Sequence, residues 1–240
     1  MEIKDKVIVV TGASSGIGEA VVKLLAGKGA KLALVARSSE KIEKLAEESA
    51  GAFAIKADMS KIDEAREMIR KTHDRFGRID VLINNAGQGY GALVEKIDIG
   101  KYRYLFDLNV LGPLVAMQTV IPIMRRQGGG TIINISSGTS QMYIPGLAAY
   151  SSTKRALNGL TLTARAELKK NNIVVSLMHP YITASDFYKN ALRDRGGEGG
   201  HARDDADLPP PDSSEYVAGK ILELMDSGEP ESFAHDWMGK

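Results

Sequence analysis

The sequence predicts an α/β protein in which a doubly wound parallel sheet is covered by helices on both faces. Short β-branched runs alternate with longer helical patterns along the chain. Runs such as VIVV and TIINI are almost wholly apolar, which is typical of strands buried on both sides. Right-handed helical crossovers join such strands into a Rossmann-like sheet.

The alternation places six strands in chain order. We expect them at residues 7–10, 31–35, 52–56, 81–83, 131–135 and 173–177. Helices fall between them, and a last helix is expected over residues 214–227 with Ser213 or Ser214 as its cap.

A chain of 240 residues is short enough for one domain, which we expect to span residues 1–240. Residues 193–214 are rich in glycine, proline and charge, so they can bury little apolar surface. We therefore expect a mobile substrate lid at about residues 184–211, ordered only when cofactor or substrate is bound.

The composition argues against several classes of function. Lys and Arg number 31 against 30 for Asp and Glu, so no field of one sign attracts nucleic acid or an acidic membrane. There is no cysteine, and the four histidines are dispersed, so we expect no thiolate site and no catalytic metal. The start lacks the pattern of a secretory signal and no apolar run approaches about 18 residues, so a cytoplasmic protein is expected.

The first strand leads into TGASSGIG, where Gly12, Gly16 and Gly18 bracket the start of a helix. A helix start offers unpaired N–H groups and a positive dipole end, and glycines let the backbone approach a pyrophosphate closely. An ordinary glycine-rich turn is the alternative. The position after the first strand of a βαβ unit favours dinucleotide binding.

The end of the second strand indicates which dinucleotide binds. An acidic residue there holds the ribose hydroxyls of NAD, whereas a basic residue accommodates the 2′-phosphate of NADP. The strand ends in Ala36 and Arg37, so we expect NADP(H) in preference to NAD(H), with an ordinary surface arginine as the alternative. Asp58 follows the third strand, where the adenine is expected; alternatively, Asp58 or Ser60 caps the next helix.

Tyr150 and Lys154 stand four residues apart on a predicted helix, so both side chains lie on one face. A neighbouring ammonium and a cationic nicotinamide favour the phenolate, which brings the pKa of a tyrosine closer to neutral pH. Such a group can protonate a carbonyl or deprotonate an alcohol. Ser137 ends the strand TIINISS, where its hydroxyl can bond the substrate oxygen. Ser136 points the opposite way, and the distance to Tyr150 favours Ser137.

Together these motifs resemble the short-chain dehydrogenase/reductase superfamily in its compact single-domain branch. Over about residues 3–187 the identity, order and spacing agree for TGASSGIG, NNAG at residues 84–87, Asn109, ISS ending at Ser137, and YSSTK. Without that resemblance, NNAG would be interpreted as a polar turn and Asn109 as a helix residue bonded to its own backbone.

The resemblance implies a catalytic set of Asn109, Ser137, Tyr150 and Lys154. In that scheme Tyr150 is the acid or base, and Lys154 lowers its pKa and holds the nicotinamide ribose. Ser137 orients the substrate, and Asn109 holds a water of the proton relay. The implied cofactor-binding residues are Gly12, Ser14, Ser15, Gly16, Ile17, Gly18, Arg37, Asp58, Asn85, Ala86, Gly87, Tyr150, Lys154, Pro180 and Thr183.

One departure from the family pattern follows the sixth strand, where the usual Pro-Gly is Pro180-Tyr181. The added ring brings bulk near the expected nicotinamide carboxamide, which bears on the role of Thr183. His179 is interpreted as a packed or turn histidine rather than a catalytic base. A mainly apolar substrate wall is expected from Met142, Tyr143, Ile144, Pro145, Leu147 and Tyr181.

These observations predict an oxidoreductase that transfers hydride between NADP(H) and a small carbonyl or alcohol. A 3-oxoacyl thioester ranks lower, because the acyl-carrier-protein reductases of this superfamily tend to carry Gln-x-Asn where this chain has Leu147-Ala148-Ala149. A redox sensor without turnover needs no activated phenol, and a sugar-nucleotide epimerase has another glycine spacing and a longer C-terminal part. Apolar positions on several faces of the helices near residues 102–126 and 150–170 predict a homodimer or homotetramer.

Overall fold

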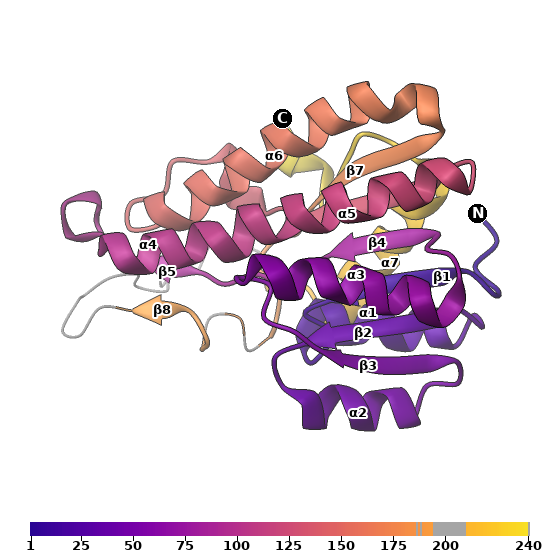
Figure 1. Ribbon diagram of the computed structural model, residues 1–240. Helices are drawn as coiled ribbons and strands as arrows, with labels where there is room; N and C mark the ends of the chain where they lie inside the picture. The colour runs from indigo at the N-terminus through magenta and orange to yellow at the C-terminus, as the bar shows by residue number, and fades with distance from the viewer. Residues whose placement is uncertain (186, 188, 194–209, 240) are drawn as a thin grey trace.

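The computed structural model describes residues 1–185, 187, 189–193 and 210–239. Its main sheet has seven parallel strands in the order β3-β2-β1-β4-β6-β7-β9 (Figure 1). They are β1 (Val7–Thr11), β2 (Lys31–Ala36), β3 (Ala52–Lys56), β4 (Val81–Asn84), β6 (Gly130–Ile135), β7 (Ile173–His179) and β9 (Glu231–Phe233). The predicted doubly wound α/β fold is confirmed, and the six expected strands are present with small shifts at their ends.

Helices cover both faces of this sheet. They are α1 (Gly16–Ala26), α2 (Ser39–Glu47), α3 (Ile62–Phe76), α4 (Ile99–Phe106), α5 (Gly112–Arg126), α6 (Ala148–Leu168) and α7 (Ser214–Ser227). Residues of α1, α2 and α7 share one apolar core, while residues of α3, α5 and α6 share another on the opposite face. Figure 1 shows α3 and α5 in front of the sheet, with α1 and α7 behind it.

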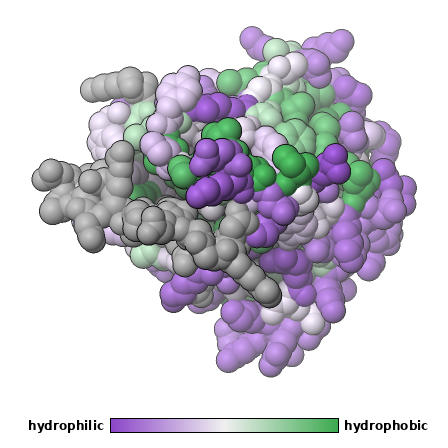
Figure 2. Space-filling view, turned by 90° about the vertical axis from the view of Figure 1, so that its left-hand side faces the viewer, coloured by the Kyte–Doolittle hydropathy of each residue, from purple (hydrophilic) through white to green (hydrophobic). Residues whose placement is uncertain are grey.

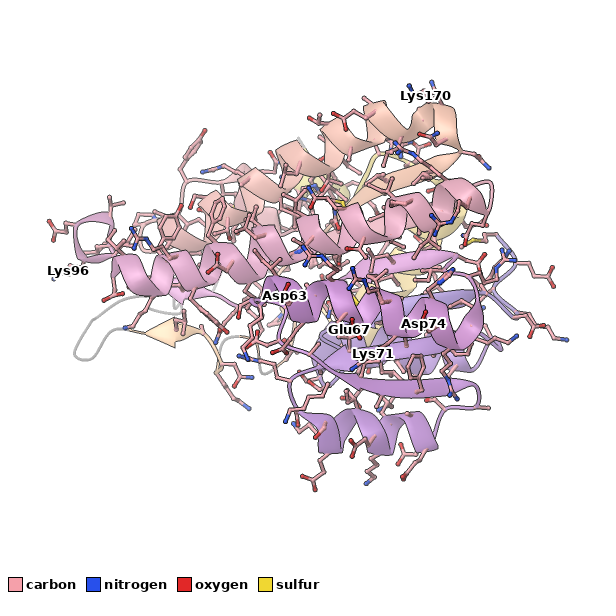
Figure 3. The ribbon with its side chains drawn as sticks, viewed as in Figure 1. Asp63, Glu67, Lys71, Asp74, Lys96 and Lys170 are labelled. Atoms are coloured by element: carbon pink, nitrogen blue, oxygen red, sulfur yellow. The ribbon has the colours of Figure 1, made fainter. Side chains whose placement is uncertain are left out.

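Helix α3 illustrates how the sequence pattern sets this layering. Its apolar residues Ala65, Met68 and Ile69 are fully buried against the sheet. The charged residues Asp63, Glu67, Lys71 and Asp74 are exposed along its outer side, as Figure 3 shows. Helix α7 has the predicted bounds, and the Ser213 side chain accepts the Tyr216 N–H over 3.0 Å, so Ser213 is its cap.

Helices α4 and α5 are joined through a single π-helical turn, η2 (Asp107–Leu111). In the described part of the chain, the stretch Ile99–Arg126 has the length and mean hydropathy, 1.4, of a membrane span. The sequence expectation counted unbroken apolar runs and missed it. The hydropathy value belongs to an 18-residue window of this stretch. Because 56% of that window is buried inside the fold, the stretch has the character of a core helix.

Two short strands form a second sheet beside the first. Strand β5 (Tyr90–Gly91) follows β4, and it pairs in parallel with β8 (Leu192–Arg193), which lies far along the chain. Most of the predicted lid, at residues 186, 188 and 194–209, lies outside the described residues. In the described part of that segment, residues 192–193 pair with β5. Directly before the segment, Thr183 forms a bridge with Asp212, which directly follows it.

The strand order reverses between β1 and β4. The chain runs from β1 outward to β2 and β3 and then returns to β4 on the other side of β1. Loops at the carboxyl ends of these two strands therefore leave in opposite directions and open a crevice, where ligands of doubly wound sheets bind. The loops after β1, β2, β3, β4, β6 and β7 carry most of the predicted site residues and begin at this edge, whereas Asn109 lies in η2 and Tyr150 and Lys154 lie on α6.

Candidate active site

The turn after β1 is closed by backbone contacts. Gly12 has a φ of 68°, a left-handed conformation that glycine adopts without steric cost. A Cβ on Gly18 would lie 2.2 Å from the Gly12 carbonyl oxygen, so α1 begins too close to the turn for a side chain there. Ile17, between them in the chain, packs against the α1 side of the core. Asn85 Nδ2 donates to the Thr11 carbonyl oxygen over 2.9 Å and fixes the turn against β4.

The first turn of α1 has backbone N–H groups without a side-chain cap. Ser15 stands at the N-cap position, and its side chain makes no cap hydrogen bond. A hollow of about 520 Å³ opens beside it. Its wall has hydroxyl, backbone and ammonium groups and also two carboxylates, from Ser14, Ser15, Gly16, Lys23, Lys41, Lys189, Glu19 and Glu215. Lys23 is paired with Glu19. The donors that can bind an anionic ligand are the helix N–H groups, the hydroxyl groups and the Lys41 and Lys189 ammonium groups.

The segment after β4 is held against β1 by one hydroxyl. Thr11 Oγ1 accepts the backbone N–H groups of Asn85 and Ala86, each over 3.0 Å. In the sheet below, Asn84 Nδ2 donates to Asn134 Oδ1 of β6 over 2.8 Å. The predicted NNAG segment is therefore more than a polar turn, since it joins three neighbouring strands at the crevice.

Arg37 after β2 and Asp58 after β3 both make hydrogen bonds that the sequence did not predict. Arg37 is exposed, and its Nη1 donates to the Tyr104 hydroxyl oxygen of α4 over 3.0 Å. Asp58 Oδ1 accepts the N–H and the hydroxyl of Ser60 over 3.0 and 2.8 Å, which closes a turn. The N-cap of α3 is Lys61, without a side-chain hydrogen bond, so the alternative that Asp58 or Ser60 caps that helix is wrong.

Tyr150 and Lys154 lie on one buried face of α6, 8% and 4% exposed. Lys154 Nζ lies 5.8 Å from the centre of the Tyr150 ring and donates to the Ile135 carbonyl oxygen over 2.8 Å. Burial lowers the pKa of Lys154 to about 8, because the ammonium has left bulk water. The ring of Phe187 lies 5.7 Å from that of Tyr150 and covers part of the phenol.

Asn109 lies in the π-helical turn, a distortion that is frequent at functional sites. Its Nδ2 donates to the Gln88 carbonyl oxygen and to Thr153 Oγ1 over 3.0 and 3.1 Å, and its Oδ1 accepts the Gln88 N–H over 3.0 Å. The alternative that Asn109 bonds to its own helix backbone is therefore wrong. A Cβ on Gly87 would lie 3.1 Å from Asn109 Oδ1 and 3.4 Å from Lys154 Nζ. The structure thus brings Gly87, Asn109 and Lys154 together.

Ser137 follows β6 and keeps a half-buried hydroxyl. Its Oγ accepts the N–H of Thr139 over 3.2 Å and the hydroxyl of Thr139 over 2.9 Å. Ser136 is buried and donates to Asn158 Oδ1 of α6 over 2.5 Å. Ser136 therefore has its hydroxyl committed to α6, and Ser137 is the hydroxyl left at the end of the strand.

The loop after β7 is joined to the loop after β6. The Pro180 carbonyl oxygen accepts the Gly138 N–H over 2.9 Å, so Pro180 sits beside the residue that follows Ser137. Thr183 is buried, and its hydroxyl donates to the Tyr181 carbonyl oxygen over 3.1 Å.

Tyr181 packs against the C-terminal end of the chain. Its ring meets the rings of His235 and Trp237 edge-on at 5.8 and 5.2 Å. His235 Nε2 in turn lies 2.9 Å from Asp212 Oδ1, beside the bridge between Asp212 and Thr183. Burial and the nearby Asp212 carboxylate raise the pKa of Tyr181. The ring that replaces the family's usual glycine is thus held by C-terminal aromatic residues.

Two further interpretations are decided by packing. His179 is fully buried, with Nε2 2.9 Å from Glu231 Oε1 and its ring stacked on Phe233 at 4.4 Å, so it is the packed histidine that we expected. Tyr143 is 91% exposed and stacks with Arg155 at 4.5 Å, so it does not form part of an enclosed apolar wall. Among the described residues, His, Asp and Glu side chains form no group of three that could hold a metal ion.

Sequence reasoning missed Gln88, Thr153, Lys41 and Tyr104. Gln88 and Thr153 hold the Asn109 amide, Lys41 lines the hollow, and Tyr104 binds Arg37. These residues were hard to predict because their partners lie far away in the chain. Threonine, lysine and tyrosine are also common on helices, so their presence alone indicates no role. The one available signal was the position of Thr153 inside YSSTK and of Gln88 directly after NNAG.

Fold and site together define a Rossmann-fold oxidoreductase. The family model of short chain dehydrogenases matches residues 6–196. An uncharacterized oxidoreductase of Staphylococcus saprophyticus is 40% identical over 190 residues, which are 77% of each chain. A 3-oxoacyl-[acyl-carrier-protein] reductase of Staphylococcus epidermidis is 39% identical over 79% of this chain and 80% of its own. An alcohol dehydrogenase from the archaeon Thermococcus sibiricus, solved with 5-hydroxy-NADP, superposes with a TM-score of 0.82 at 28% identity, covering 96% of both chains. The chain belongs to the short-chain dehydrogenase/reductase family.

Proposed function

We propose that this oxidoreductase is an NADP(H)-dependent carbonyl reductase or alcohol dehydrogenase that acts on a small substrate through Tyr150, Lys154, Ser137 and Asn109. The observation that carries the proposal is Lys154, an ammonium buried beside a phenol. Burying a charge costs free energy, and a helix needs no such residue for its stability. A perturbed group of this kind, next to a crevice, is typical of a catalytic site.

The residues at the crevice fit a dinucleotide. The uncapped N–H groups of α1, the hydroxyls of Ser14 and Ser15 and the hollow beside them suit phosphate groups. The segment Asn85 to Gly87 would lie along the cofactor, with Pro180 and Thr183 at its nicotinamide end. When bound, the nicotinamide ring supplies or accepts the hydride.

The choice of NADP(H) depends on the residues after β2. Ala36 offers no carboxylate that would bind the ribose hydroxyls or repel a phosphate, and Arg37 offers a guanidinium that can bind the 2′-phosphate with two N–H groups. Asp58, whose Oδ1 already accepts from Ser60, would meet the adenine through its remaining oxygen.

In the direction of reduction, Tyr150 donates its phenol proton to the carbonyl oxygen of the substrate. The Lys154 ammonium stabilises the negative charge that the Tyr150 oxygen then carries. Ser137 Oγ already accepts two hydrogen bonds from Thr139, so its own proton is available to the substrate oxygen, where charge develops.

Asn109 would hold the water of the proton relay that reaches Lys154. Both N–H groups of its amide are occupied by Gln88 and Thr153, and its Oδ1 accepts one hydrogen bond. An amide oxygen has two lone pairs, so one remains for the relay water assigned to this residue.

The experiment that tests the proposal is Tyr150→Phe. We expect kcat to fall by about 10² or more, because a positioned acid or base contributes that order, while the dissociation constant of NADP⁺ changes less than about threefold. The exposed Tyr143→Phe is the matched control and should keep full turnover. Near-normal kcat in Tyr150→Phe would remove the phenol from the chemistry.

A second candidate substrate is a 3-oxoacyl thioester, which the name of the Staphylococcus epidermidis relative favours. Against it, Leu147, Ala148 and Ala149 stand where the reductases of that class tend to carry Gln-x-Asn. NADPH oxidation should be measured with small ketones, aldehydes and keto sugars beside an acetoacetyl thioester. A higher kcat/KM for the thioester would reverse our ranking.

We also propose that the protein is a homodimer or homotetramer of one domain, with a small molecule as its ligand and neither nucleic acid nor membrane as a partner. Exposed apolar residues lie before and in α4, including Leu93, Val94 and Ile99. Figure 2, which views the molecule from this end, has hydrophobic residues gathered in its upper right part and hydrophilic ones below. Light scattering at micromolar concentration should give a mass above 25.9 kDa; a mass at that value would contradict the oligomer.

A further inference from the structure

Arg37 and Tyr104 meet although 67 residues separate them in the chain. Arg37 Nη1 donates to the Tyr104 hydroxyl oxygen over 3.0 Å. Among the described residues this is the one hydrogen bond of the Arg37 side chain, and no ion pair holds it. A single contact from α4 therefore determines where this exposed guanidinium lies.

The contact lies at the crevice rather than on a remote surface. Arg37 directly follows β2, whose Val35 carbonyl oxygen accepts the Ala13 N–H of the glycine turn over 3.2 Å. Tyr104 lies on α4, five residues before Asn109, and is half-buried among the residues of the core that includes Met59 and Ala86. The pair thus joins the end of β2 to α4, the helix directly before the π-helical turn that carries the proposed catalytic residue Asn109.

A phenol suits this task chemically. The hydroxyl oxygen accepts from the guanidinium, and four of the five guanidinium N–H groups remain for an anion. The long side chain of a free arginine samples many rotamers, and fixing it on binding lowers affinity. A hydrogen bond that already holds the guanidinium removes part of that loss. The tyrosine is neutral, so it does not compete with a phosphate as a carboxylate partner would.

We propose that Tyr104 is a positioning residue for cofactor specificity, which holds the Arg37 guanidinium at the place where the 2′-phosphate of NADP(H) binds. This inference rests on the proposed preference for NADP(H). It adds that the preference depends on α4 as well as on the end of β2, and that it acts through Arg37.

The test measures dissociation constants of NADP⁺ and NAD⁺ by calorimetry without substrate, because the two ligands differ only in the 2′-phosphate. We expect Tyr104→Phe to weaken NADP⁺ about three- to tenfold, the range of one hydrogen bond, and to change NAD⁺ less than twofold. In the Arg37→Ala background the same substitution should have no further effect, because its route to the phosphate is gone.

Tyr102→Phe is the matched control. It lies on the same helix, but its hydroxyl lies 2.9 Å from Ser152 Oγ on α6, so the ratio of the two constants should not change. Thermal unfolding of each variant establishes that it is folded. Should Tyr104→Phe prove unfolded, Tyr104→His, which keeps a polar group on the side chain, and Tyr104→Leu, which removes it, take its place in the same comparison.

Three results would overturn the inference. An unchanged or increased affinity of Tyr104→Phe for NADP⁺ would mean that Tyr104 does not support the arginine or holds it away. A persistent loss in the Arg37→Ala background would mean that Tyr104 acts on its own. If the unmodified protein binds NAD⁺ as tightly as NADP⁺, the proposed cofactor preference fails as well, whereas the first two results leave that preference intact.

Discussion

Two loops at the same edge of the sheet are held in different ways. The turn between β1 and α1 is fixed from within the sheet, with the Gly12 carbonyl oxygen against the start of α1 and the side-chain amide of Asn85, from the segment after β4, on the Thr11 carbonyl oxygen. The loop after β7 is fixed from a distance, by the ring contacts of Tyr181 with His235 and Trp237 and by the bridge to Asp212. The first loop thus depends on its own backbone and on the segment after the neighbouring strand β4, whereas the second depends on the C-terminal end of the chain.

This difference is consistent with different roles for the two loops. Under the proposed function, the first loop would face the cofactor phosphates, whose positions are the same for every substrate. The second follows β7 beside Ser137, where substrates of different shape would bind. Two substitutions and one deletion test whether the two loops are supported independently.

The largest effect is expected from Gly18→Ala in the turn. The new Cβ would lie 2.2 Å from the Gly12 carbonyl oxygen, a backbone atom, and 2.7 Å from Asn85 Nδ2, which is hydrogen-bonded to the Thr11 carbonyl oxygen. Overpacking of this kind lowers the free energy of unfolding by about 1–3 kcal/mol or more. Because the turn is displaced, the affinity for NADP⁺ should fall about 10²-fold. Denaturant unfolding and calorimetry measure the two effects.

Gly159→Ala is the control for that experiment. A Cβ on Gly159, in α6, has nothing within 4 Å, so alanine should add up to about 1 kcal/mol of stability through its helix propensity. If Gly18→Ala binds NADP⁺ normally, the local geometry of the turn is not what supports the phosphates.

The second effect concerns Lys154, whose ammonium lies beside Gly87 and the end of β6. Its pKa in the folded protein, about 8, is below the ordinary value of 10.5, so the unfolded chain binds more protons between these pH values. Stability of the protein without cofactor should therefore rise as the pH increases from about 8 to 10.5. Below about pH 8 the cost of burying the ammonium is present in full.

Lys154→Met removes that cost. We expect it to raise the free energy of unfolding at pH 7 by about 1–3 kcal/mol, to flatten the rise above pH 8, and to abolish turnover. Denaturant unfolding at several pH values measures this. A less stable Lys154→Met variant at pH 7 would mean that the hydrogen bond to the Ile135 carbonyl oxygen outweighs the burial of the charge.

The smallest effect is expected from deleting residues 235–240. The loop after β7 would lose the ring contacts of Tyr181 and the partner of Asp212, each worth about 0.5–1.5 kcal/mol. Backbone hydrogen exchange at Ala184, which donates to the Asp212 carbonyl oxygen, should speed up about tenfold. Exchange at residues 12–18 and the affinity for NADP⁺ should change less than threefold. Equal acceleration in both loops would show that they are not independent.

The fold class and most of the strand positions could be predicted from the amino-acid sequence. Buried parallel strands are continuous apolar runs and amphipathic helices repeat their apolar positions, so both patterns are local and legible. Strand β9 escaped because it has three half-buried residues at the edge of the sheet, and the π-helical turn at Asn109 escaped because no local pattern specifies it. The motif residues Gly12, Gly18, Tyr150 and Lys154 were identified because each motif is short and contiguous in the sequence.

The burial and the hydrogen-bond partners of the motif residues could not be predicted from the sequence and follow from the packing of helices on the sheet. Burial by the surrounding helix and strands sets the pKa of Lys154, and no spacing in YSSTK contains that information. The partners of Asn109, Arg37 and Tyr181 come from residues 21 to 67 positions away, so their contacts depend on how helices dock on the sheet. Periodicity predicts which residues form an element, whereas long-range packing determines which side chains meet at its end.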